Sequence, residues 1–152
     1  MRITLSVIGR AKAGVHQDLY QHYVGRLSWP IALRELEVRR ALDDGKRKGA
    51  EGELLLGAIP QDARLIALDE RGKNLSSPQF ARLLADWRDD GFAHIAFAIG
   101  GADGLDHRVL EAAHFRLAFG AATWPHMLVR GLLAEQLYRA QSILTGHPYH
   151  RA

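Results

Sequence analysis

The sequence has 152 residues, of which 47% are hydrophobic, and its 20 lysines and arginines exceed its 17 acidic residues to give a formal net charge of +3. This length and composition are typical of one globular domain, and the absence of cysteine excludes disulfides, thiolate metal sites and cysteine nucleophiles. No run approaches the roughly 20 apolar residues of a membrane helix, and the apolar start is too short for a signal sequence, so we expect a cytoplasmic protein with no membrane partner.

Short β-rich runs alternate with longer helical ones, a pattern that predicts an α/β domain with a mostly parallel sheet flanked by helices. In chain order, we expect strands at 2–8, 33–38, 64–68, 94–99 and 115–119, and helices at 16–27, 46–58, 78–89, 106–113 and 125–144. Most of these strands are too apolar to have a solvated face, which is typical of central strands covered on both sides. No repeat or linker divides the sequence, so we expect a single domain over residues 1–152.

Two of the expected helices begin at clear signals. Ser76 or Ser77 can cap the helix at 78–89, and Pro78 suits its first turn. The apolar residues of this helix, at 80, 83, 84 and 87, recur at the spacing of one helix face. Pro125 opens the last helix, which carries apolar residues on more than one side, so we expect it to be buried on several faces.

The last helix also carries residues that a buried helix ordinarily lacks, because an uncompensated charge is costly to bury. These are Arg130, Glu135, Gln136 and Arg139. An i, i+4 pair between Glu135 and Arg139 would give a purely structural explanation for two of them. The alternative is that a ligand phosphate, a second subunit or an RNA backbone provides the counter-ion. A basic cluster at 39–48 similarly allows either a solvated loop or an RNA contact.

Common nucleotide-binding and hydrolase signatures are missing: the sequence has no GxxxxGK[ST], no GxSxG, no HExxH, and no GxGxxG after a strand. Other segments follow the expected strands, at 68–72, at 99–104 with three glycines, and at 119–126. Because open α/β sheets bind ligands at the carboxyl ends of their strands, we expect these three turns to form one pocket. Small side chains and accessible amides there suit an adenine and a ribose better than a triphosphate. Glycines in such turns also have a purely steric explanation, which stays open.

The tail at 145–152 is rich in stacking and hydrogen-bonding groups, after a glycine and a proline that end the last helix. An unstructured terminus is the ordinary expectation for such a segment. A flipped base could instead stack on Tyr149. His126, His147 and His150 offer a zinc site, and with it a small metal-dependent hydrolase, although their spacing is not a standard ligand motif.

Six segments, in this order and spacing, closely resemble the RlmH-type ribosomal RNA large-subunit methyltransferases of the SPOUT superfamily. They are LDERGK at 68–73, SSPQFA at 76–81, IGGADG at 99–104, PHMLVR at 125–130, EQLYRA at 135–140 and HPYH at 147–150. The likeness extends over essentially the whole chain. Two conservative departures are Ala102-Asp103-Gly104, where the family more often has Pro-Glu-Gly or a similar triplet, and Trp124, where it commonly has leucine or phenylalanine.

The resemblance implies transfer of a methyl group from S-adenosylmethionine to N3 of a pseudouridine in 23S ribosomal RNA, on assembled ribosomes and without a metal. It also implies a homodimer with a SPOUT fold, whose C-terminal part at 65–152 is threaded as a trefoil knot. The donor contacts that carry over from the family are Leu68, Gly100, Phe119, Gly120, Ala121, Ala122, Thr123 and Trp124.

With this likeness, we expect Arg139, His147, Tyr149 and His150 to position the target base, with the tail of one subunit closing over the donor site of the other. His150 or an ordered water would take the proton from N3, and an arginine could stabilise the developing anion. The principal rival is a non-catalytic RNA-binding protein of the same fold, which would keep the basic cluster and lack a donor pocket. Binding of the donor distinguishes the two.

Overall fold

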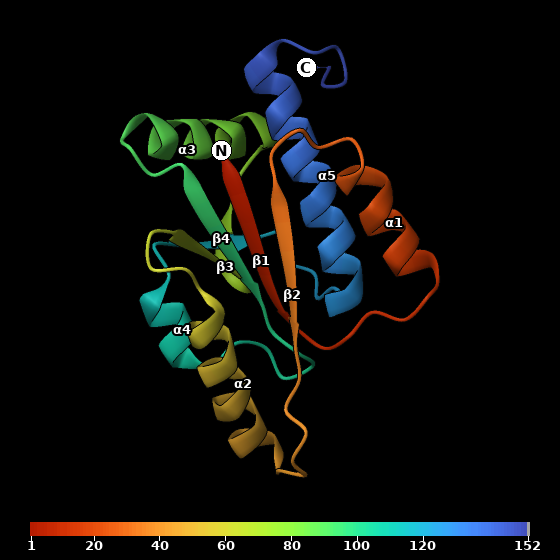
Figure 1. The fold of residues 1–152 in the computed structure, drawn as a ribbon, viewed down its shortest axis with the longest axis vertical. Coiled ribbons are helices and arrows are strands. Elements are labelled where there is room, and N and C mark those ends of the chain that lie inside the picture. Colours follow the sequence, from red (N-terminus) through yellow and green to blue (C-terminus); the bar gives the residue numbers. More distant parts are fainter. Residues whose placement is uncertain (152) are drawn as a thin grey trace.

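The computed structural model describes residues 1–151, so Ala152, the last residue of the expected tail, lies outside the described residues. Strands and helices alternate along the chain (Figure 1), which confirms the predicted α/β class. The strands are β1 (Arg2–Ile8), β2 (Ile31–Leu36), β3 (Arg64–Asn74), β4 (His94–Ile99) and β5 (Phe115–Ala118). The helices are α1 (Val15–Val24), α2 (Asp44–Ala58), α3 (Ser77–Asp89), α4 (His107–Ala112) and α5 (His126–Thr145).

The five strands form one sheet in the order β2-β1-β4-β3-β5, and every neighbouring pair is parallel. This arrangement confirms the expected parallel sheet. β4 is buried along its whole length and β1 from Ile3 onwards, as their apolar sequences predict, whereas β2 at one edge is only partly buried. Because the strands run in one direction, all their carboxyl ends lie at the same edge of the sheet.

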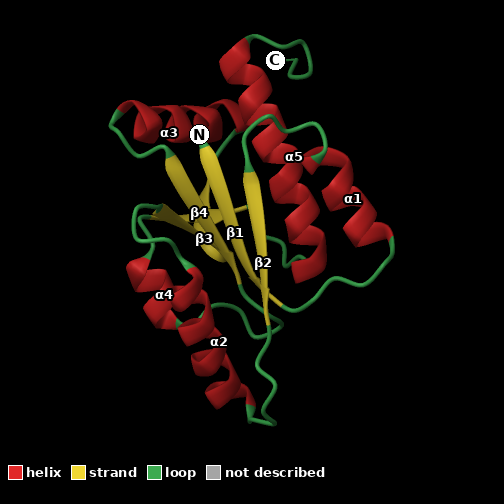
Figure 2. Ribbon diagram, in the orientation of Figure 1, coloured by secondary structure: helices red, strands yellow, loops and turns green. Residues whose placement is uncertain are grey.

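Helices cover both faces of the sheet (Figure 2). On one face, α1, α3 and α5 contribute Tyr20, Phe80 and Leu133 to a core cluster. On the other face, α2 and α4 contribute Leu55 and Val109 to a second cluster. The larger side chains of β4 lie in the first cluster and its alanines in the second, because side chains alternate between the two faces along a strand.

Local sequence explains where two helices begin and end. At the start of α3, the Ser76 side chain accepts a hydrogen bond from the Gln79 N–H, and the Gln79 side chain accepts one from the Ser76 N–H. This capping box identifies Ser76 as the cap, and such a cap contributes about 1 kcal/mol. α5 ends at Gly146, which has a φ of 73°, a left-handed conformation that favours glycine.

Three strands differ from their predicted bounds, and of these β5 only ends one residue early, at Ala118. β2 lies two residues earlier than predicted. β3 was predicted to end at Leu68 but continues to Asn74, because Leu68 and Lys73 both pair with Leu117 of β5, and residues 69–72 loop out between them. The longer strand depends on pairing with a distant segment, which local sequence does not reveal. Along residues 1–151, no helix combines the length and apolar character needed to cross a membrane.

Candidate active site

A cavity of about 450 Å³ lies at the carboxyl edge of the sheet, beside β3, β4 and β5. These three strands are neighbours in the sheet, so the segments that follow their buried residues lie close together. The cavity is lined by residues 68–71, 99–105, 117–120 and 122–124, together with Lys48, Leu110, His126 and Val129. The prediction that three turns form one pocket is therefore confirmed.

The glycine turn at 100–104 lines the cavity and is tightly packed against its own backbone. A Cβ on Gly100 would lie 2.6 Å from the carbonyl oxygen of Gly104, so even alanine requires the backbone to move. The Gly104 N–H donates to the carbonyl oxygen of Gly101 at 3.1 Å, and Gly104 has a φ of 79°. Glycine adopts this conformation without the strain that a side chain would cause. Glycine at these positions is therefore required by the shape of the turn itself.

The segment at 119–124 forms a second wall, and hydrogen bonds hold it in place. The indole N–H of Trp124 donates to the carbonyl oxygen of Phe119 at 2.9 Å, which closes the segment on itself. The hydroxyl of Thr123 donates to the Glu70 carboxylate at 2.8 Å. Because Glu70 belongs to the looped-out part of β3, that irregularity in the strand fixes the position of the second wall.

Of the eight residues predicted as donor contacts, seven line the cavity and Ala121 does not. Their role in binding a donor stays a prediction. Sequence reasoning missed several other lining residues, among them Lys48, Leu105 and Val129. The place of Lys48 depends on how α2 packs, which no local pattern gives. Val129 carries a detectable signal, because it follows His126 by three residues and therefore shares its helix face.

The charge of the cavity wall does not suit a polyanionic ligand. Its lining includes three carboxylates, those of Asp69, Glu70 and Asp103, against the cations of Lys48 and Arg71. A triphosphate cradle requires the opposite balance. Beside these groups, burial and a nearby arginine lower the pKa of His126, so its imidazole is neutral at pH 7. The cavity thus favours a neutral or cationic ligand.

Arg130 of α5 is 2% exposed, and its counter-ion is Glu35 of β2, at 2.8 Å. Arg130 also donates to the carbonyl oxygens of Ile8 and Gly9, at 3.3 and 2.8 Å. Burial alone would raise the pKa of Glu35, but a hydrogen bond from the Ala11 N–H and the Arg130 guanidinium outweigh it and lower the pKa. The charge of Arg130 is therefore balanced within the chain, without a ligand phosphate or an RNA backbone.

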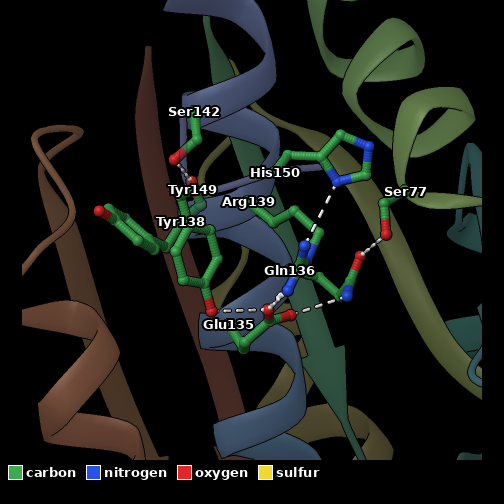
Figure 3. A network of polar contacts seen from close by, with 8 residues as sticks. All are labelled: Ser77, Glu135, Gln136, Tyr138, Arg139, Ser142, Tyr149 and His150. Carbon is green, nitrogen blue, oxygen red and sulfur yellow. Dashed lines mark hydrogen bonds and ion pairs between the residues drawn. The ribbon is translucent and has the colours of Figure 1, made fainter. Parts of the chain in front are cut away.

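The tail folds back along the second half of α5 as far as the carboxylate of Glu135 (Figure 3). Glu135 accepts hydrogen bonds from Nε of Arg139 at 2.9 Å and from the Tyr149 hydroxyl at 3.0 Å, so the expected i, i+4 pair is confirmed. The Arg139 guanidinium lies 4.7 Å from the centre of the Tyr149 ring and 3.3 Å from Nδ1 of His150. His147 accepts a hydrogen bond from the Tyr149 N–H at 3.2 Å. All four residues predicted to position a base thus lie together, and their catalytic role stays a prediction.

The tail and the cavity contact different parts of α5. His126 and Val129 in its first turn line the cavity, whereas Tyr149 and His150 follow its last residue. Glu135, to which the Tyr149 hydroxyl donates, is nine residues from His126, or about 14 Å along the helix axis, and Figure 1 places the C-terminus beside the amino ends of the strands. In this arrangement no tail residue that the structure describes lines the cavity of its own chain. His147 lies against Tyr138, twelve residues along α5 from His126, so the alternative zinc site does not form within one chain. Residues 1–151 contain no group of three or more His, Asp or Glu side chains that could hold a metal ion.

Comparison with known sequences places this geometry in a family. Residues 1–150 match the model of a family described as a predicted SPOUT methyltransferase. A ribosomal RNA large subunit methyltransferase H of Rhodospirillum centenum is 57% identical over 152 residues, which cover 100% of both chains. A protein of the same name from Paramagnetospirillum magneticum is 54% identical over 151 residues, which cover 99% of both chains.

Solved structures support the same fold. A probable methylase family protein from Haemophilus influenzae matches with a TM-score of 0.58 and 13% identity, covering 99% of this chain and 70% of that protein. A probable methyltransferase from Bordetella pertussis matches with a TM-score of 0.56 and 15% identity, covering 91% of this chain and 95% of that protein. At these identities the likeness concerns the fold alone.

Proposed function

Because this chain belongs to the SPOUT methyltransferase family, we propose that it transfers a methyl group from S-adenosylmethionine to N3 of a pseudouridine in 23S ribosomal RNA. The observation that carries the proposal is the cavity at the carboxyl edge of the sheet, with its glycine-rich turn and its lack of excess positive charge. The full-length relatives named ribosomal RNA large subunit methyltransferase H support the substrate class.

The cavity fits the nucleoside part of the donor. A Cβ on Gly104 would meet no atom within 4 Å, so the turn leaves open space beside its backbone, and peptide groups there can hydrogen-bond an adenine. Leu68, Phe119 and the adjoining small residues add apolar contacts for the ring. In this proposal the eight predicted residues hold the donor, except that Ala121 acts only through the shape of its segment. Bound S-adenosylmethionine supplies a methyl group that its sulfonium has already activated.

We propose that two copies of the chain form the working enzyme. In one chain the tail binds Glu135, nine residues or about 14 Å along α5 from His126 at the cavity, and no tail residue up to position 151 lines that cavity. In this proposal the tail that closes over the cavity therefore comes from another copy. In such a dimer, Arg139, His147, Tyr149 and His150 of one copy close over the cavity of the other. A closed dimer satisfies this requirement with a single self-complementary interface.

The protein then contributes alignment, exclusion of water and help in removing a proton. N3 of the base loses its proton, attacks the methyl carbon, and the electron pair of the broken carbon–sulfur bond stays on sulfur. The Tyr149 ring offers a stacking surface for the flipped base, and the neighbouring cation of Arg139 stabilises the anion that forms on the base. None of these steps needs a metal.

The basic cluster at 39–48 supports contact with the phosphate backbone of the RNA. Lys48 lies at the cavity wall, and Arg39, Arg40 and Lys46 are exposed near it in sequence. Phosphate contacts of this kind give salt-sensitive binding, while the flipped base provides specificity. We propose that the substrate is the assembled ribosome in the cytoplasm, because a chain of one small domain has little surface with which to read an isolated RNA.

We also propose that residues 65–152 carry the trefoil knot of the SPOUT fold. Family membership supports it. An experimental structure in which the chain does not thread through a loop within residues 65–152 would contradict it.

Transfer of tritium from labelled S-adenosylmethionine to ribosomes that lack the modification tests the proposed function. We expect label in 23S RNA with the wild-type protein, and loss of transfer with retained donor binding in Tyr149→Ala and His150→Ala. Full activity in both variants would remove the role of the tail. A folded protein that does not bind the donor in isothermal titration would favour the non-catalytic RNA-binding rival.

A further inference from the structure

The contact between Arg139 and His150 decides where the imidazole carries its proton. Nη1 of Arg139 lies 3.3 Å from Nδ1 of His150 (Figure 3). A guanidinium only donates hydrogen bonds, so Nδ1 has to accept, and a neutral imidazole then carries its hydrogen on Nε2. A protonated imidazole carries hydrogen on both nitrogens, so its Nδ1–H would point at an N–H of Arg139. Nε2, the nitrogen that remains free, therefore offers a hydrogen and not a lone pair.

Glu135 fixes the arginine that makes this contact. Nε and Nη2 of Arg139 both donate to Oε1 of Glu135, and the Tyr149 hydroxyl donates to the same oxygen. The other oxygen, Oε2, accepts from Gln136 at 2.7 Å, and Gln136 accepts from the Ser77 hydroxyl of α3 at 2.8 Å. The side chains of Glu135 and Arg139 are only 17% and 25% exposed, so this charge-assisted pair is shielded from solvent. The guanidinium is held from one side by Glu135, and Nη1 is left to face His150.

The Tyr149 hydroxyl is not a proton acceptor in this arrangement. It donates its hydrogen to Glu135, and burial together with hydrogen bonds to Tyr23 and Glu135 raises the pKa of Tyr149. Tyr149 therefore stays protonated, and its contribution is the ring that faces Arg139.

We propose that Glu135 is a positioning residue for methyl transfer, which acts through Arg139 to hold His150 in the Nε2–H tautomer, and that this Nε2–H donates to a carbonyl oxygen of the target base. The inference rests on the proposed function. When N3 loses its proton, the negative charge spreads to the neighbouring carbonyl oxygens, and a donor aimed at one of them stabilises the anion. Because Nε2 already carries hydrogen, the N3 proton passes to water.

Nitrogen-15 NMR of the full-length protein tests the tautomer directly, because the two neutral tautomers differ in chemical shift. The His150 signals are assigned by their loss in His150→Gln. We expect the Nε2–H tautomer in the wild type and a mixture of both in Glu135→Gln, which keeps the side-chain shape and removes the charge. An Nδ1–H tautomer in the wild type, or unchanged signals in Glu135→Gln, would overturn the proposal.

Asp86→Asn is the matched control for the spectra. Asp86 forms an i, i+4 pair with Arg82 at 2.8 Å on the exposed side of α3, so its loss removes the same charge far from the tail. It should leave the His150 signals unchanged. Since the spectra need neither donor nor RNA, they remain informative even if the wild-type protein transfers no methyl group, a result that would contradict the proposed function alone.

Transfer assays separate a donating His150 from a proton-accepting one. The amide of glutamine can donate from a position close to Nε2 but cannot take up a proton. His150→Gln should therefore keep kcat within about tenfold of the wild type, while His150→Leu should lose about 10²–10³-fold. Glu135→Gln should lower kcat about tenfold or more by misplacing these groups, with an unchanged Kd for the donor. Equal losses in His150→Gln and His150→Leu would identify His150 as the base and refute the inference.

Discussion

Replacing Gly100 with alanine places one methyl group against the backbone of the turn that we assign to the donor. The new Cβ would lie 2.6 Å from the carbonyl oxygen of Gly104 and 3.1 Å from the backbone nitrogen of Leu105. Cβ contacts below 3.0 Å essentially do not occur, so the shorter distance must open by about 0.4 Å, and neither partner is a flexible side chain that can rotate away. The turn itself has to move.

The cost of this movement sets the expected loss of donor binding. Inserting a methyl group into a well-packed site costs about 1–3 kcal/mol. If donor binding requires the original position of the turn, the same free energy is lost from binding, and Kd rises about 5- to 150-fold. Isothermal titration of the variant and the wild type with S-adenosylmethionine measures this ratio.

Gly57→Ala is the matched control, because a Cβ on Gly57 in α2 would meet no atom within 4 Å. It should bind the donor like the wild type and raise stability by about 0.5–1 kcal/mol, since alanine favours a helix. Thermal unfolding must show that Gly100→Ala is folded. A folded Gly100→Ala protein with a donor Kd within a factor of two of the wild type would refute the assignment of this turn.

Further predictions concern stability, pH and RNA binding. Glu35→Gln leaves Arg130 buried without its counter-ion and should lower the free energy of unfolding in urea by about 3 kcal/mol. The pKa of Glu35 is lowered in the folded state, so the ionised carboxylate stabilises the fold fully above the ordinary pKa of 4.5. This stabilisation is lost as the pH falls through the lowered pKa, where the stabilities of the wild type and of Glu35→Gln should converge. The pKa of His126 is lowered from 6.5, and below this lowered pKa its imidazolium repels the cationic donor. The Kd for the donor should therefore rise as the pH falls through that pKa, and His126→Gln should remove this rise. Lys48→Gln should raise KM for ribosomes and reduce the salt slope of binding by about one unit.

Each of these predictions has a control or a contradicting result. Glu37→Gln removes a carboxylate that is 52% exposed and pairs with Arg10 at 3.5 Å, so it should change stability by less than about 1 kcal/mol. Equal losses in the Glu35 and Glu37 variants would mean that burial of Arg130 is not the cause. A donor Kd that is independent of pH in the wild type would exclude the His126 effect, and an unchanged salt slope would exclude Lys48 from the RNA interface.

The parts of the fold that depend on local signals were predictable from the sequence. α3 needs only a cap, a proline in its first turn and apolar residues at helical spacing, and the structure begins it one residue from the predicted start. β4 is a run of six buried residues at the predicted bounds. The sequence also predicted that three turns lie at the same edge of the sheet, because parallel strands place their carboxyl ends together.

The missing parts depend on contacts between distant segments. Arg130 was seen as a charge that needs a partner, but Glu35 lies 95 residues away on another element, and no spacing connects them. The extension of β3 likewise depends on its pairing with β5. For the tail, the sequence indicated which groups gather near Tyr149, but their separation from the cavity becomes visible only when α5 is placed between the two.

Mixed dimers provide the most direct test of a site shared between two copies. Gly100→Ala damages the cavity and His150→Leu damages the tail, so a purified dimer with one copy of each has one intact pair of cavity and tail. We predict that each parent dimer transfers little tritium to ribosomes, whereas the mixed dimer recovers about half of the wild-type activity. A mixed dimer as inactive as its parents would contradict a site built from the cavity of one chain and the tail of the other.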